Sequence, residues 1–155
     1  MLYNALVGSY LRYAVRAWGS ASPNLCSCLQ AAQNKVIRAL LFLPPSSDVS
    51  QKFSELRIQN VENIFEHEVA KLIHSVYYKY CPSAFSNFFE VASHRYATRL
   101  REYSFFSLMK PNTEFGKKSL KFFGVKIWFK LPSVIKEIPK PEIFNREFKK
   151  LYFDN

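Results

Sequence analysis

The opening stretch, residues 1–18, constrains the fold more than any other feature, because its polar and glycine positions recur at one fixed spacing. These positions are Asn4, Gly8, Arg12 and Arg16, with Ser9 beside them. Residues four apart share one face of an α-helix, so the spacing predicts a helix over residues 1–18 whose remaining faces contact protein. Gly19 follows directly and is expected to end this helix as its C′ residue.

A second helix is predicted from Ser22 to about Leu43. Ser22 is its expected N-cap, Pro23 is its first helical residue, and Pro44 stops it. Its expected apolar stripe is Leu25, Leu29, Ala32, Val36, Leu40 and Leu43, with Gln30, Asn34 and Arg38 on the other side. The short turn between the first two helices favours an antiparallel hairpin.

The third predicted helix is the long one. It covers residues 61–80, and Asn60 is its expected N-cap. Helical periodicity is lost after residue 92. The elements expected in the remaining chain are a short β-hairpin, with strands at residues 103–109 and 119–123 around a turn at 110–113, and short helices at residues 133–138 and 142–152.

The predicted fold class is therefore mainly α. A helical hairpin and the long third helix form one helical domain, residues 1–92. An irregular basic and aromatic segment, residues 93–155, carries the short β-hairpin and the short terminal helices and packs on that domain. With 155 residues and a hydrophobic content of 48%, the chain can bury a core of moderate size.

The charge is basic and unevenly distributed. The formal net charge is +10, and residues 93–155 hold fourteen Lys and Arg against six acids. The first 47 residues contain no acid at all. A basic surface without compensating carboxylates favours a polyanionic partner, nucleic acid or an anionic membrane. The alternative is that the charge only keeps the protein in solution.

No set of residues suited to self-sufficient catalysis is present in the sequence. Clustered carboxylates that could hold two metal ions are missing, as no Asp-Asp pair occurs. Neither Gly-x-Ser-x-Gly nor His-Glu-x-x-His occurs, and four glycines provide no phosphate-binding loop. We expect no catalytic residue in this chain.

Metal, secretion and membrane signals are also weak. Cys26, Cys28 and Cys81 are odd in number and lack zinc-site spacing, and His67 and His74 have no companion ligand at a suitable spacing. We expect no metal site. The cysteine usage favours a reducing, intracellular compartment, nucleus or cytoplasm. No uninterrupted apolar run has membrane-spanning length, so a membrane is not an expected partner.

Three aromatic-basic motifs stand in a fixed order along the chain. They are Tyr10-Leu11-Arg12-Tyr13 with Trp18-Gly19, then His94-Arg95-Tyr96-Ala97-Thr98-Arg99, then Gly124-x-x-x-Trp128-x-x-Leu131-Pro132. Together they resemble the C-terminal part of the reverse transcriptase of non-LTR retrotransposons, of the LINE-like and jockey-like kind. That part follows the catalytic palm, and residues 1–43 resemble its later thumb helices. Phe129 departs from the family, which usually has Asn after the tryptophan.

The resemblance implies a non-catalytic fragment of an RNA-directed DNA polymerase, thumb and post-thumb region, which begins within the thumb. It implies sequence-independent binding of RNA and DNA, without polymerase activity from this chain alone. No cofactor is expected, because a divalent metal would belong to the missing palm. Contact with the missing palm and fingers, or self-association, is also implied. The alternatives are a structural or protein-interaction helical module, or a decayed retrotransposon copy, without nucleic-acid binding.

Candidate site residues fall into two groups. The expected nucleic-acid contacts are Arg12, Arg16, Lys35, Arg38, Arg95, Arg99, Arg101, Lys117, Lys118, Lys121, Lys126 and Lys130. The expected structural motif residues are Tyr96, Thr98, Gly124, Trp128, Leu131 and Pro132. Two alternatives stay open: Arg12 and Arg16 extend to solvent at a helix edge, and Trp128 serves as a base-stacking platform instead of a core anchor.

Overall fold

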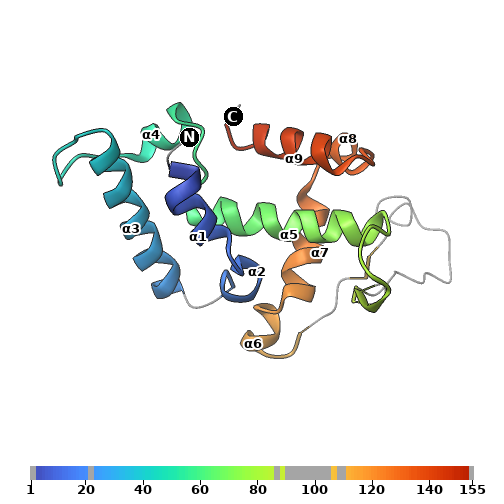
Figure 1. Ribbon diagram of the computed structural model, residues 1–155. Helices are drawn as coiled ribbons and strands as arrows, with labels where there is room; N and C mark the ends of the chain where they lie inside the picture. The colour runs from blue at the N-terminus through green and yellow to red at the C-terminus, as the bar shows by residue number, and fades with distance from the viewer. Residues whose placement is uncertain (1–2, 21–22, 86–87, 90–105, 108–110, 154–155) are drawn as a thin grey trace. The chain divides into compact units, whose positions relative to one another are not determined.

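The protein is built from helices, which Figure 1 shows in chain order. The computed structural model describes residues 3–20, 23–85, 88–89, 106–107 and 111–153. The longer helices are α3 (Pro23–Leu40), α5 (Val61–Tyr77), α7 (Leu120–Lys130) and α9 (Pro141–Lys150). The shorter ones are η1 (Asn4–Gly8), α1 (Ser9–Arg12), α2 (Val15–Trp18), α4 (Ser50–Glu55), η2 (Ser83–Phe85), α6 (Glu114–Lys117) and α8 (Ser133–Lys136). The described residues contain no strand, which confirms the mainly α fold class.

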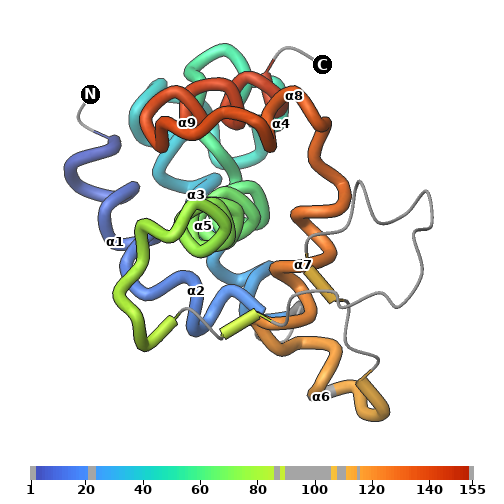
Figure 2. Tube along the Cα trace, turned by 90° about the vertical axis from the view of Figure 1, so that its right-hand side faces the viewer, coloured from blue at the N-terminus to red at the C-terminus, as the bar shows by residue number. Residues whose placement is uncertain are grey.

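The chain divides into two compact units. The first unit comprises Met1–Glu68 and Lys149–Asn155, and the second comprises Val69–Phe148. Helix α5, which Figure 2 shows close to end-on, contributes its first half to the first unit and its second half to the second. The domain boundary predicted between residues 92 and 93 lies outside the described residues.

The prediction of one uninterrupted helix over residues 1–18 was wrong. The chain is interrupted after α1, where Tyr13 is extended with ψ 121° and Ala14 is left-handed with φ 50°. The interruption leaves the Tyr13 carbonyl without a helical donor, and Trp18 Nε1 donates a hydrogen bond to it at 2.9 Å. The side chain of Trp18 therefore stabilises the break.

Gly19 is needed for close packing and not for a left-handed turn. It caps α2 with φ −66°, an ordinary right-handed conformation. A Cβ atom placed on Gly19 would lie 2.2 Å from Cδ2 of Phe65, on α5. The small residue lets the end of α2 pack against the first half of α5 within the first unit.

Three helices end in the same hydrogen-bonded motif without glycine. At the end of α3, the Leu43 N–H donates to the Arg38 carbonyl at 2.9 Å, and Phe42 between them has φ 54°. Arg57 after α4 and Lys79 after α5 take the same place, with φ 51° and 59°. This is the Schellman arrangement, whose left-handed position usually holds glycine. None of the four glycines of the chain has a positive φ.

The apolar stripe predicted for the second helix was placed on the wrong side. Leu25 is 59% exposed and Leu40 is 38% exposed, whereas Gln33 and Ile37 are buried on α3. The buried face of α3 therefore includes a glutamine. Its burial is possible because it forms hydrogen bonds with polar groups inside the first unit. The predicted N-cap Ser22 lies outside the described residues.

The start of α5 is as predicted. The Asn60 side-chain oxygen accepts a hydrogen bond from the Asn63 N–H at 2.7 Å, which confirms the capping role. Buried apolar side chains of the first unit include Val15, Ile37, Val61, Ile64 and Phe65.

Helix α7 replaces the strand predicted at residues 119–123. Ser119 is its N-cap, and the Ser119 hydroxyl accepts from the Phe122 N–H at 3.3 Å. The helix buries Gly124, Val125, Ile127 and Trp128. Burial at these spacings is helical, so the predicted β-hairpin partner at 119–123 was wrong. The predicted short helices after residue 132 are present as α8 and α9.

The core of the second unit is aromatic and centred on Trp128, which is 2% exposed. Its ring centroid lies 5.2 Å from that of Tyr77, 6.1 Å from Phe106 and 6.4 Å from Phe144. Four residues earlier, a Cβ on Gly124 would lie 2.8 Å from Cδ1 of Ile73. The Gly124-x-x-x-Trp128 motif thus places a close helix contact and a large buried ring on one face of α7.

Candidate functional site

The predicted basic cluster in the described part of the chain lies along α6 and α7. Its members Lys117, Lys118, Lys121, Lys126 and Lys130 are all exposed. Figure 2 shows α6 leading into α7, so these lysines follow one continuous stretch of the second unit. The structure therefore presents the whole of this part of the predicted site to solvent.

The outer side of α7 combines lysine with phenylalanine. Phe122, Lys126, Phe129 and Lys130 follow the spacing i, i+4, i+7, i+8, which places them on one helical face. We call these four residues the α7 basic face. Phe129 is 38% exposed, so part of its ring is available to a partner. The buried residues Gly124 and Trp128 occupy the opposite side of the helix.

The lysines of the cluster differ in their local contacts. Lys117 forms an ion pair with Glu114 one turn earlier, and Lys121 Nζ lies 5.3 Å from the centroid of the Phe88 ring. The hydrogen bond from Lys117, and then the charges of Lys117 and Lys118, lower the pKa of Glu114. No acidic partner is recorded for Lys126 or Lys130 within the described residues, so their charges face solvent unneutralised.

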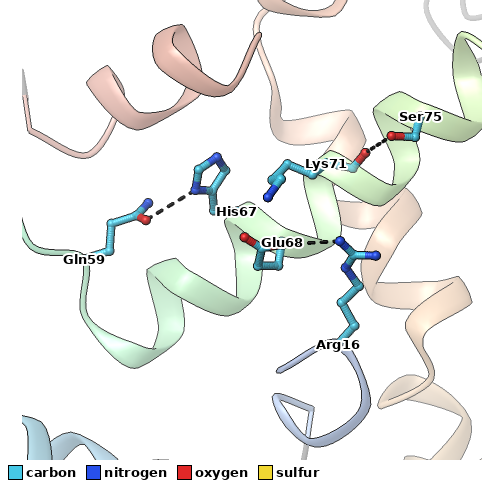
Figure 3. Close-up of polar contacts among 6 residues, drawn as sticks. All are labelled: Arg16, Gln59, His67, Glu68, Lys71 and Ser75. Atoms are coloured by element: carbon cyan, nitrogen blue, oxygen red, sulfur yellow. Dashed lines mark hydrogen bonds and ion pairs between the residues drawn. The ribbon is translucent and has the colours of Figure 1, made fainter. Parts of the chain in front are cut away.

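Two of the four predicted contacts in the opening part are engaged within the first unit. Arg16 Nη2 lies 3.3 Å from Glu68 Oε2, an ion pair that Figure 3 shows between α2 and α5. Arg38 Nε donates to the Ser47 carbonyl at 2.9 Å and holds the loop that follows α3. Arg12 is half-buried and Lys35 is exposed on α3. The first 47 residues contain no acid, so the carboxylate that pairs with Arg16 comes from another helix, α5.

The second predicted motif cannot be placed. Arg95, Tyr96, Thr98, Arg99 and Arg101 all lie outside the described residues.

The remaining motif residues have structural positions. Trp128 has the buried setting of a core anchor and does not offer its ring for stacking. Leu131 is 7% exposed and caps α7, and its N–H donates to the Trp128 carbonyl at 3.2 Å. Pro132 then begins α8 as its N-cap.

A buried polar network in the first unit was missed in the sequence. Gln33 Nε2 donates to the Tyr3 hydroxyl at 2.6 Å and to the Gln59 carbonyl at 2.8 Å. The Gln59 side-chain oxygen lies 3.3 Å from Nδ1 of His67 (Figure 3). The network connects the opening helix, α3 and the start of α5. Its only signal in the sequence is a glutamine beside apolar residues of α3.

Neither a metal centre nor a membrane span can be assigned to the described residues. No three His, Cys, Asp or Glu side chains of this part gather closely enough to hold a metal ion. Cys26, Cys28 and Cys81 are thiols, not disulfides. Of the helices that the structure describes, none has both the length and the apolarity to cross a lipid bilayer.

Among the described residues, the exposed lysines of α6 and α7 are therefore the part of the predicted site that a partner can reach. No protein-family model matches the sequence, and neither a curated protein nor a solved structure is significantly similar to it.

Proposed function

We propose that this protein is a non-catalytic module that binds RNA and DNA backbones without sequence preference. The observation that carries the proposal is the α7 basic face, where exposed Lys126 and Lys130 alternate with Phe122 and Phe129. Lysines in such a row contact phosphates and release counterions, while exposed aromatic rings can stack on unpaired bases. Single-stranded nucleic acid or an RNA–DNA hybrid is the expected partner.

The motif resemblance gives this binding a context. In a non-LTR retrotransposon reverse transcriptase, the module would steady the RNA template and the nascent DNA beside the catalytic palm. The compartment proposed for it is the nucleus or the cytoplasm, where such nucleic acids occur. Binding of this kind needs no cofactor.

A salt titration tests the proposal. Binding of a labelled single-stranded oligonucleotide is measured by fluorescence anisotropy from low to physiological salt. We expect log K to fall linearly with log salt concentration, and each lost phosphate contact to reduce the slope by about 0.7. Lys126→Gln and Lys130→Gln should each show this smaller slope. Absence of binding at low salt would refute the proposal.

A matched control separates a specific face from overall charge. Lys140 is exposed before α9 and lies off the α7 basic face, so Lys140→Gln removes the same charge elsewhere. We expect Lys140→Gln to bind as the unaltered protein does. Equal losses in all three variants would mean that net charge, and not this face, provides the affinity.

A second candidate function, a protein-interaction module, rests on a different observation. Leu6, Tyr10 and Tyr13 are 59%, 79% and 80% exposed in the opening part of the chain. Exposed apolar side chains close in sequence are typical of protein contacts. Under this function the protein should self-associate with increasing concentration in sedimentation velocity, and Leu6→Ser with Tyr10→Ser should abolish the association.

A further inference from the structure

The first unit contains a pocket of about 330 Å³ between α3, α4, the start of α5 and the C-terminal residues after α9. Its volume is in the range of small-molecule sites. The described residues that line it include no charged side chain. They are Gln30, Asn34, Ser50, Phe53, Ser54, Ile58, Asn60, Asn63, Tyr152 and Phe153.

Hydrogen bonds from the backbone determine which atoms of the Asn34 and Asn60 side-chain amides can still bind a ligand. The Val61 N–H can only donate, and it donates to Gln30 Oε1 at 3.0 Å. The Gln30 NH₂ group must therefore be the donor to Asn34 Oδ1 at 2.9 Å, which leaves the Asn34 NH₂ group for another partner. The orientation of Asn34 thus follows from the chain itself and is not an arbitrary choice between nitrogen and oxygen.

The same reasoning applies at the start of α5. The Asn63 N–H donates to Asn60 Oδ1 at 2.7 Å, so the Asn60 NH₂ group is left as a donor. The Asn63 side chain has no hydrogen bond recorded to any part of the described chain, and it offers both a donor and an acceptor. The residues that line the pocket therefore keep unused donors on Asn34 and Asn60 and a complete amide on Asn63.

Three aromatic residues and Ile58 provide the apolar part of the lining. The aromatic residues are Phe53, Tyr152 and Phe153. The Tyr152 hydroxyl donates to Glu66 Oε2 at 2.7 Å, which holds the ring in place. Burial raises the pKa of Tyr152, and the hydrogen bond and negative charge of Glu66 raise it further, so the phenol stays a neutral donor.

We propose that this pocket binds an uncharged nucleobase, with the Asn63 amide paired to the edge of the base and the aromatic lining against its face. Primary amides recognise adjacent donors and acceptors on bases by two hydrogen bonds, and aromatic side chains stack on bases. A phosphate finds no cation among the lining residues. The inference deepens the proposed function by adding a contact for bases, and a free nucleoside tests it apart from backbone binding.

The direct test is a titration of the full chain with adenosine, guanosine, cytidine and uridine, followed by ¹H–¹⁵N NMR. We expect saturable shifts of the side-chain NH₂ signals of Asn34, Asn60 and Asn63 with at least one nucleoside. The affinity should not change with salt, since no phosphate takes part. Ribose and methyl glucoside are the comparison ligands. Failure of all four nucleosides, or equal saturation by either sugar, would overturn the proposal.

Variants identify the binding residues. Asn63→Ala removes an amide that supports no recorded internal contact, and it should weaken nucleoside binding by about tenfold. Ser54→Phe should abolish binding, because it fills the pocket from α4. Asn24→Ala, on an exposed position of α3 away from the lining, is the matched control and should bind normally. Unchanged affinity in both pocket variants, with native NMR dispersion, would place the nucleoside elsewhere.

The two proposals can fail separately. Lys126→Gln/Lys130→Gln should leave nucleoside binding intact while it reduces the salt dependence of oligonucleotide binding. Asn63→Ala should have the opposite effect. It should leave the salt dependence of oligonucleotide binding unchanged and weaken nucleoside binding. If the chain binds a nucleoside but does not bind oligonucleotides, the pocket proposal stands and the proposed backbone interface is refuted.

Discussion

Arg16 and Glu68 form an ion pair across the first unit, with Nη2 of the arginine 3.3 Å from Oε2 of the glutamate. The side chains are unequally exposed, 44% for Arg16 and 10% for Glu68. Loss of the arginine would therefore leave a nearly buried carboxylate without this partner. We expect Arg16→Ala to lower the free energy of unfolding by about 1–2 kcal/mol, a value reduced by the exposure of Arg16.

Urea unfolding of a double-mutant cycle checks this value. Glu68→Gln removes the charge that needs compensation, so Arg16→Ala should cost clearly less in that background. Additive effects of the two substitutions would show that the pair contributes nothing to stability.

Gly19→Ala should destabilise the protein by at least about 1–3 kcal/mol, because the added methyl group overlaps a packed ring. Its Cβ would lie 2.2 Å from Phe65 Cδ2 and 2.6 Å from the Val15 carbonyl oxygen. Gly8 is the control, since the nearest neighbour of a Cβ there would be the movable end of Asn4 at 3.1 Å, and the Tyr3 atoms at 3.6 and 3.7 Å are at ordinary contact distance. Gly8→Ala should be neutral or stabilising by up to about 1 kcal/mol, from helix propensity. Thermal unfolding of both variants is the measurement, and an equal effect would contradict the packing role of Gly19.

Lys79→Gly should raise the free energy of unfolding by about 1 kcal/mol. Lys79 has φ 59°, a conformation that costs an L-residue about 1–2 kcal/mol and costs glycine little. Lys35, which is helical and exposed, provides the opposite case: Lys35→Gly should destabilise by about 1 kcal/mol. Guanidinium unfolding distinguishes them, and a destabilised Lys79→Gly protein would show that the lysine side chain contributes more than its backbone costs.

Stability should fall as the pH falls below about 6.5, the ordinary pKa of histidine. Burial lowers the pKa of His74, and the hydrogen bond between His74 Nε2 and the Ile138 carbonyl, 2.7 Å long, offsets this only in part. The unfolded chain then binds the proton first. The stability contributed by neutral His74 is complete above pH 6.5 and is lost as the pH falls through the lower folded pKa.

The slope from His74 should reach at most about 1.4 kcal/mol per pH unit. Urea unfolding at a series of pH values measures it. His74→Gln should flatten the curve in this range, at some cost in stability from the lost stacking on Phe144, whose ring lies 4.1 Å away. An unchanged curve in that variant would assign the acid sensitivity to another group.

Local signals in the sequence predicted those elements whose ends are made locally. Asn60 caps α5 through the backbone N–H three residues later, Pro132 precedes α8 and Pro141 begins α9, so the starts of these helices needed no knowledge of the tertiary structure. The prediction of a strand at residues 119–123 was wrong because the alternation of polar and apolar residues covers too few positions to indicate a strand. The buried residues Gly124, Ile127, Trp128 and Leu131 have helical spacing, and their burial is satisfied by a helix.

Other features depended on distant residues. The close approach of Phe65 to Gly19 is one of them, because the two residues are far apart in the sequence. The polar pocket was equally hidden, because it combines α3 amides with a tyrosine from the end of the chain. The lysines of the α7 basic face were predicted from the composition of this stretch. That they lie on one side of a helix became clear only from the structure.

The three left-handed helix ends have a practical consequence for biophysical measurement. Phe42, Arg57 and Lys79 each sit where the backbone is held by two hydrogen bonds at the tip of a helix, and the Phe42 side chain is 94% exposed. A fluorophore or spin label attached at such a position turns with its helix and not with a loose loop. These tips are therefore suitable anchor points for reporting how α3, α4 and α5 reorient when a partner binds.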